Sequence, residues 1–276
     1  MNSDNSALVG LTLDYGPFAF MEKYVPLYNP WVGGGVPYSF GRQPQAAAIN
    51  LAGLSNAFIE LLRIACEEEG MEEAVMEVKT KEMKQCVSGV FVDTFHQAHD
   101  ENCRRKLGVA EWDDDARDLW ADLLRMMVSS CGEGMDFTGF FRSLSRPPPP
   151  AGADATADAV LQLLQPAALQ DTGAWPADHL VEWSAWTARY WERVAADGVP
   201  EAERLAEMRR NNPKFIMRNW MMAEAYDAAE TGDFSVVRQL QLVLSAPYDE
   251  QGGEYERYAQ PTPQWARERP GLAYMS

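Results

Sequence analysis

The sequence contains few of the residues from which metal centres and nucleophile sites are most often built. It has three histidines and four cysteines in 276 residues. The cysteines are widely spaced, with no Cys-x-x-Cys pair and no histidine near them in a ligand pattern, so a zinc site is not expected. Each cysteine lies in a stretch with helical character, which predicts reduced and partly buried thiols.

Other common signatures of chemistry are also missing. The chain has no G-x-S-x-G elbow and no Walker glycine loop. His96 and His99 are spaced i, i+3, but no third and fourth ligand accompany them, so we interpret both as surface residues. His179 stands alone near an expected helix start and is interpreted as structural. The acidic clusters lack the spacing of a calcium loop.

Positive charge is scarce relative to negative charge. The formal net charge is -17 and the pI is about 4.6. Such a chain repels phosphate backbones and anionic lipid headgroups, so we expect neither nucleic acid nor a membrane as a partner. We also find no apolar run of the length that spans a bilayer, and the first ten residues resemble neither a signal peptide nor a transit peptide.

Helical periodicity dominates what is present, after a short β-favouring start. Residues 7–13 favour strand structure around a glycine. From about residue 45 the apolar residues recur every three to four positions, as in Leu54, Phe58 and Leu61, which predicts a long helix. A second long helix is predicted over about 72–106. The sequence therefore predicts a mainly α fold with a small β entry.

Capping residues mark several further helix boundaries. Asp136 is a candidate N-cap for a short helix over "DFTGFFRSL". Asn212 and Pro213 are predicted to begin a helix that Gly232 stops. Three tryptophans at helical spacing predict core packing rather than a ligand cage: Trp183, Trp186 and Trp191.

One change in composition indicates an internal boundary. Four consecutive prolines begin at Pro147 and are followed by a stretch rich in alanine, which favours an extended spacer. We therefore divide the chain into a first region at 1–146, a linker at 147–160 and a helical extension at 161–276, which we expect to pack on the first region.

The strongest candidate for chemistry is a pair of oxygen-bearing side chains near the start. Asn5 and Asp14 flank the β-favouring run, so a hairpin would bring them together, and both offer the hard ligands that Mg²⁺ prefers. Asp4 could serve as a base or as a third ligand. Asn and Asp are also ordinary turn residues, so spacing alone leaves a structural interpretation open.

The surrounding motif resembles a known family. The segment "MNSDNSALVGLTLDYGPFAFMEKYVP" is similar to the catalytic core of the selenoprotein O family, also called the YdiU family. Further segments resemble that family in the same order: "YSFGRQPQAAAINL", "RRKLGV", "DFTGFFRSL", "NNPKFIMRN", "GDFSVVRQL" and "PYDEQ". The likeness therefore runs along nearly the whole chain.

The resemblance implies a fold and an activity. It implies a kinase-like C-lobe, with the metal ligands on a short N-terminal β-hairpin and the N-lobe absent from this chain. It also implies a protein adenylyltransferase that binds ATP with Mg²⁺, or Mn²⁺ as the alternative, and transfers AMP to Ser, Thr or Tyr hydroxyls of proteins. In that scheme Asn5 and Asp14 bind the metal and nucleotide, and Asp4 is the catalytic base.

The same resemblance sets limits on this chain. The family's glycine-rich loop and phosphate-binding lysine would lie upstream of Met1, so we expect the chain alone to be inactive. The compartment implied is mitochondrial, and otherwise cytoplasmic. Two rivals stay open: a catalytically dead helical scaffold of the same fold, and a kinase-type phosphotransferase.

Overall fold

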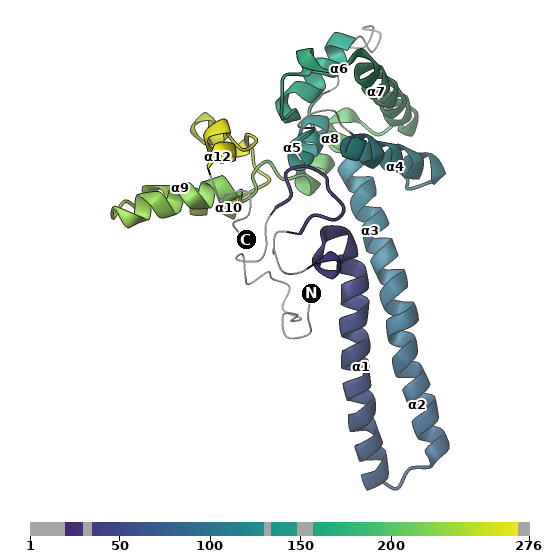
Figure 1. The fold of residues 1–276 in the computed structure, drawn as a ribbon. Helices are drawn as coiled ribbons and strands as arrows, with labels where there is room; N and C mark the ends of the chain where they lie inside the picture. The colour runs from purple at the N-terminus through teal and green to yellow at the C-terminus, as the bar shows by residue number, and fades with distance from the viewer. Residues whose placement is uncertain (1–19, 30–34, 130–133, 148–156, 270–276) are drawn as a thin grey trace. The chain divides into compact units, whose positions relative to one another are not determined.

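The computed structural model describes residues 20–29, 35–129, 134–147 and 157–269 (Figure 1). These residues are mainly helical, and their only β feature is an isolated antiparallel bridge between Met135 and Ala168. The prediction of a mainly α fold is therefore confirmed for this part of the chain. The predicted N-terminal β-hairpin lies outside the described residues.

The chain divides into two compact units, which are described separately below. Unit 1 comprises residues 1–15 and 26–100, and unit 2 comprises residues 16–25 and 101–276. Helix α3 (Val92–Leu107) begins in the first unit and ends in the second. The linker predicted at 147–160 stays a prediction, because most of it lies outside the described residues.

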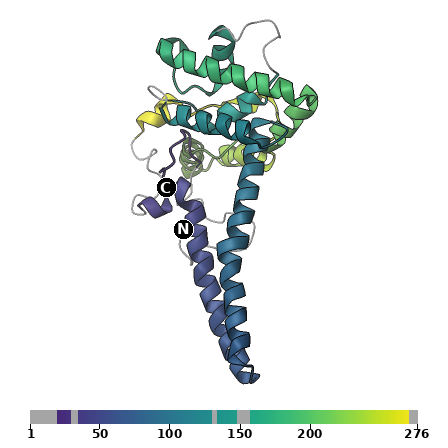
Figure 2. The ribbon, with the colours of Figure 1, turned by 90° about the vertical axis from the view of Figure 1, so that its right-hand side faces the viewer.

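The described part of unit 1 is a helical hairpin. Short 3-10 turns lead into α1 (Gln43–Glu68), which is followed by α2 (Glu73–Gln85) and a π-helical turn that joins α3. Figures 1 and 2 both show α1 and α2 side by side. Gly70, at φ 66°, makes the left-handed turn that ends α1. The two predicted long helices are thus confirmed.

Helix α1 corrects one expectation from the sequence. The helical stretch Phe40–Glu68 has 29 residues and a mean hydropathy of 1.3 over its most apolar window, so by length and composition alone it could cross a bilayer. The reason is that Glu60 is the first charged residue after Arg42, and the residues between them include several alanines, leucines and isoleucines. The test rests on length and composition alone, and a helix that packs against other protein passes it too.

Unit 2 contains a first core of packed helices. Its helices are α4 (Asp114–Ser129), α5 (Phe137–Leu144), α6 (Ala157–Leu164), α7 (Ala177–Asp197) and α8 (Glu201–Asn211). Trp183 and Trp186 are buried in this core and Trp191 packs against it, as their spacing predicted. The buried indole of Trp186 donates a hydrogen bond to the Leu119 carbonyl at 2.9 Å, which ties α7 to α4.

A second, smaller core forms around the C-terminal helices of unit 2. These are α9 (Asn219–Glu230), α10 (Ser235–Ser245), α11 (Glu256–Ala259) and α12 (Gln264–Glu268). Trp220 stacks on Tyr258 inside it, with ring centroids 6.1 Å apart. Gly232, at φ 85°, ends α9 as the sequence predicted.

The predicted start of this helix at Asn212 and Pro213 is wrong, because α9 begins at Asn219. The amide of Asn212 is already used by distant partners: it donates to the Lys106 carbonyl at 3.0 Å and to the Ser145 hydroxyl at 3.3 Å. The backbone N–H of Lys214 then donates to the Pro247 carbonyl at 2.8 Å. These non-local bonds hold the connection before α9 out of the helix.

Candidate functional site

The three residues predicted to carry chemistry lie outside the described part of the chain. Asp4, Asn5 and Asp14 therefore stay predictions. Their donor set of amide and carboxylate oxygens suits Mg²⁺, which prefers hard ligands. Within the described ranges, no group of three His, Cys, Asp or Glu side chains could hold a metal ion. What the structure does describe begins at Phe20, and it shows how the segment that follows the motif is held.

Glu22 is the anchor of that segment. Its backbone carbonyl accepts a hydrogen bond from the Phe137 N–H at 2.7 Å. Its carboxylate accepts from Arg218 Nη1 at 3.1 Å and from the Thr262 N–H at 2.5 Å. These donors come from the start of α5, the connection before α9 and the connection before α12. Residue 22 is therefore fixed by three separate parts of unit 2.

Arg218 joins Glu22 to a second, buried carboxylate. Its Nη1 atom lies 2.6 Å from Asp136 Oδ2, and the side chains of Arg218 and Asp136 are only 5% and 1% exposed. Asp136 also accepts from the Gly139 N–H and so caps α5, which confirms the predicted N-cap. Burial alone would lower the pKa of Arg218, but the Asp136 and Glu22 carboxylates outweigh it and raise that pKa. The guanidinium thus stays charged.

Two neighbours complete this anchor. Tyr24 stacks on Phe137 with ring centroids 5.3 Å apart, and burial raises the pKa of its hydroxyl. Met21 is buried, and its sulfur accepts the Val25 N–H at 3.2 Å. The segment is therefore held through its backbone, a charged pair and an aromatic contact.

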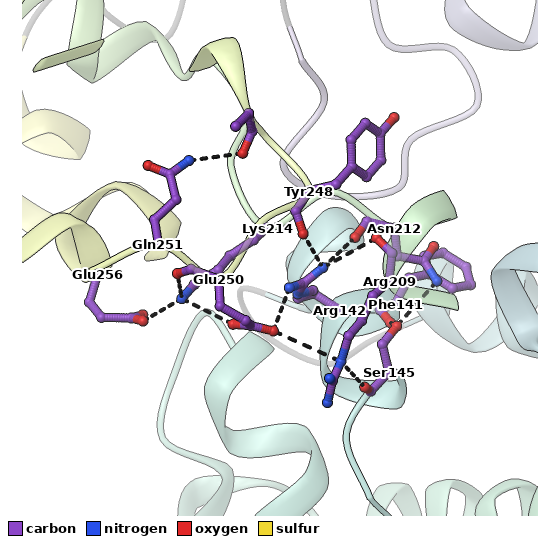
Figure 3. Close-up of polar contacts among 11 residues, drawn as sticks. Phe141, Arg142, Ser145, Arg209, Asn212, Lys214, Tyr248, Glu250, Gln251 and Glu256 are labelled. Atoms are coloured by element: carbon purple, nitrogen blue, oxygen red, sulfur yellow. Dashed lines mark hydrogen bonds and ion pairs between the residues drawn. The ribbon is translucent and has the colours of Figure 1, made fainter. Parts of the chain in front are cut away.

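A second polar cluster, drawn in Figure 3, centres on Arg142 of α5. Its Nη1 atom donates to the backbone carbonyls of Asn212 at 3.0 Å, Tyr248 at 3.2 Å and Arg209 at 3.4 Å. Its Nη2 atom donates to Glu250 Oε1 at 2.5 Å. We call this set the Arg142 clasp, because one guanidinium joins α5, the end of α8 and the loop that follows α10.

Lys214 supports the clasp from the other side of Glu250 (Figure 3). Its Nζ atom lies 3.3 Å from Glu250 Oε2 and donates to the Glu250 carbonyl at 2.7 Å. Burial opposes ionisation of Glu250, but Arg142 and Lys214 lower the pKa of its carboxyl. Gln251, at φ 52°, donates from its side chain to the carbonyls of Val243 and Ala246, both at 2.8 Å. The loop that follows α10 is thus held by hydrogen bonds at two consecutive residues, Glu250 and Gln251.

The chemistry available at the clasp is limited. The pocket beside it has a volume of about 120 Å³ and is lined by both signs of charge, including Arg142, Lys214, Glu250 and Glu256. Sites for drug-sized or nucleotide-sized ligands are typically ~300 Å³ or larger. Its cations also already hold carboxylates and carbonyls. The Arg142 clasp is therefore a structural element of unit 2.

The histidines and cysteines follow most of the expectations set by the sequence. His96 and His99 are exposed, as predicted. His179 is buried and its ring packs edge-on to Trp175 at 5.4 Å, which confirms a structural role. Cys66 and Cys103 are buried free thiols, whereas Cys86 is an exposed free thiol. Cys131 lies outside the described residues.

With this geometry described, comparison with known proteins identifies the class. Curated relatives carry the name protein nucleotidyltransferase YdiU. The relative from Methylobacillus flagellatus is 33% identical over 278 residues, which cover 100% of this chain and 48% of the relative. The relative from Myxococcus xanthus is 35% identical over 269 residues, covering 97% of this chain and 48% of the relative. The chain spans about half the length of the curated relatives it matches.

The family follows from a second comparison. The family model described as "Protein adenylyltransferase SelO" matches residues 1–245. The chain therefore belongs to this family, and the resemblance stated from the sequence is confirmed.

Sequence reasoning missed Glu22, Arg218 and Arg142. Each is a charged residue, a type that is seldom buried, and their partners lie up to 240 residues away in the chain. The one available signal was Asp136. As an N-cap beside several phenylalanines, its carboxylate is expected to be buried, and a buried carboxylate needs a cationic partner.

Proposed function

We propose that this chain is part of a protein adenylyltransferase that transfers AMP from ATP to Ser, Thr or Tyr hydroxyls of proteins. The observation that supports this most strongly is the match of residues 1–245 to a family described as protein adenylyltransferase. Relatives named protein nucleotidyltransferase give the same class of reaction. Because the chain spans only about half of those relatives, the activity is proposed for the whole protein.

In the proposed reaction the acceptor hydroxyl oxygen forms a bond to the α-phosphorus of ATP. The bond to the β-phosphate oxygen breaks, and pyrophosphate leaves. Asp4 takes the proton of the hydroxyl, which requires only that its carboxylate reach the attacking oxygen. Asn5 and Asp14 would hold Mg²⁺, or Mn²⁺ as the alternative, which when bound neutralises phosphate charge. Glu22 and Arg218 would fix the segment that leaves this site.

The proposal includes the fold and the compartment. The helical units would form the C-lobe of a kinase-like fold, and the glycine-rich loop and phosphate-binding lysine would come from a part that this chain does not span. The proposed compartment is the mitochondrion, or otherwise the cytoplasm. The chain by itself would then neither bind ATP tightly nor transfer AMP.

A labelled-nucleotide assay tests the activity. The purified chain, and a fusion of the chain to the unmatched half of the M. flagellatus relative, are each incubated with α-labelled ATP, Mg²⁺ and a generic protein substrate. We expect label on the substrate with the fusion only, and loss of label in its Asp14→Asn and Asp4→Asn forms. A substrate that gains phosphate without label, identified by mass spectrometry, would favour the kinase alternative.

A scaffold function is the second candidate, and one observation favours it. Unit 1 exposes a row of large apolar side chains along α1, which is typical of an interaction surface. A fusion that folds and remains inactive with ATP, while still binding protein partners through this row, would support the scaffold.

A further inference from the structure

Helix α1 has three distinct sides. On the inner side the Ser55 hydroxyl donates to the Met83 carbonyl of α2 at 3.4 Å, so this side faces α2. On the flank, Arg63 pairs with Glu60 and with Glu67, at 2.6 Å and 2.5 Å. The third side, which neither the hairpin partner nor these ion pairs occupy, carries no charge until Glu68, the last residue of the helix.

That third side is a row of large apolar residues. Spacings of i, i+4, i+7 and i+10 place them on one face of the helix. We call this row the α1 outer face, and its members are 44%, 47%, 61% and 43% exposed: Leu54, Phe58, Leu61 and Ile64. A contiguous apolar patch beside a charged rim is the arrangement of a protein interface, not of a solvated surface.

We propose that the α1 outer face packs against the half of the family polypeptide that this chain does not span. The chain covers 48% of the M. flagellatus and M. xanthus relatives, so each has about as much polypeptide again. A partner within the same polypeptide loses little translational and rotational freedom on docking. The chemistry of the face calls for an apolar helix or groove that accepts side chains at i, i+4 and i+7 spacing.

A membrane fits this face less well. Helix α2 packs beside α1 and carries charged residues on several sides, including Glu77, Lys79 and Glu82, which would enter the hydrocarbon with it. The tip of the hairpin is also acidic, with glutamates at 67–69, which anionic headgroups repel.

A second copy of the chain also fits less well. The net charge of -17 makes two copies repel each other, and the acidic tip would be duplicated in a parallel pair. Self-association would in addition lack the high effective concentration that a partner within the same polypeptide has.

The test uses the unmatched half of the M. flagellatus relative as a separate polypeptide. We expect a one-to-one complex with this chain on size-exclusion chromatography. Leu61→Glu and Phe58→Glu should weaken the complex by roughly tenfold or more, because each buries a charge at an apolar contact. Asn56→Glu is the matched control, since it adds the same charge to the same helix at an exposed polar position, and it should leave binding within about twofold.

A second measurement covers the case in which the separate half does not fold. In the fusion of the chain to that half, hydrogen exchange of α1 amides should be roughly tenfold slower than in the chain alone. Leu61→Glu should abolish that difference, and Asn56→Glu should preserve it. These readouts need no ATP or substrate, so they stand apart from the proposed activity.

Several results would overturn the proposal. Equal binding by the Leu61→Glu and Asn56→Glu forms would show that the complex uses another surface. Unchanged α1 exchange in a folded fusion would show that the other half does not cover α1. A dimer of the chain alone that Phe58→Glu dissociates would assign the face to a second copy. Binding of the chain to neutral lipid vesicles that the same variant abolishes would assign it to a membrane.

Discussion

Helices α1 and α7 differ in a way that composition does not predict. Helix α1 is the more apolar of the two, yet its large side chains Leu54, Phe58 and Leu61 are exposed. Helix α7 is less apolar overall, yet Trp183, Trp186 and Tyr190 are buried. Burial depends on which elements pack against a helix. Helix α7 packs against α4, α6 and α8 in unit 2, whereas in the described part of unit 1 the helix beside α1 is α2. The aromatic residues of α7 are therefore covered within unit 2, whereas the described part of unit 1 leaves the α1 outer face exposed.

The largest difference between the two regions should appear on truncating an aromatic residue. Trp183→Ala in unit 2 removes a fully buried side chain and should lower the free energy of unfolding by about 3–5 kcal/mol. Phe58→Ala on the α1 outer face removes a side chain that is 47% exposed and should cost far less, about 1 kcal/mol, in the chain alone. Urea unfolding followed by circular dichroism measures both, and similar costs would contradict the contrast.

Breaking a buried ion pair in unit 2 should also destabilise the protein more than breaking an exposed pair in unit 1. Arg218→Met leaves the buried Asp136 carboxylate without its cation and should cost about 3–5 kcal/mol of unfolding free energy. Arg63→Met breaks exposed pairs in unit 1 and should leave the free energy of unfolding almost unchanged. Limited proteolysis near residue 22 offers a local readout, since Arg218→Met alone should accelerate cleavage there. Equal cleavage rates in the Arg218→Met and Arg63→Met variants would show that Arg218 does not hold the segment around Glu22 in place.

A third, smaller effect concerns pH. Burial raises the pKa of Tyr190 to about 12, and the Arg204 guanidinium, 3.2 Å from the hydroxyl, opposes it only in part. An unfolded tyrosine ionises near pH ~10, so the stabilisation is present below pH ~10 and is lost as pH rises through about 12, amounting to about 2–3 kcal/mol. Unfolding of wild type and Tyr190→Phe between pH 9 and 12 checks this. Parallel profiles would contradict the assignment.

Capping and periodicity rules predicted most helices and two of their ends. Contacts between residues far apart in the chain determined one helix start and the buried ion pair. The N-cap at Asp136 and the stop at Gly232 follow from a few neighbouring residues, and both are confirmed. The helix start at Asn212 was wrong because Lys106 and Ser145, far away in the chain, take its side chain. The pairing of Arg218 with Asp136 was likewise invisible, since 82 residues separate them.

The periodicity of α1 shows the same limit. The row of Leu54, Phe58 and Leu61 correctly predicted a helix. Periodicity reports that a face is apolar, but not whether the polypeptide at hand contains the partner that covers it. The candidate metal residues Asp4, Asn5 and Asp14 were found through the resemblance to a family, and they stay predictions.

The most direct test of the contrast between the two regions is native-state hydrogen exchange of the chain alone and of the fusion. We predict that in the chain alone the amides of α1 exchange far faster than those of α7, and that the fusion slows exchange in α1 while leaving α7 unchanged. Equal protection of α1 and α7 in the chain alone would contradict the account, because it would mean that α1 is already stable without a partner on its outer face.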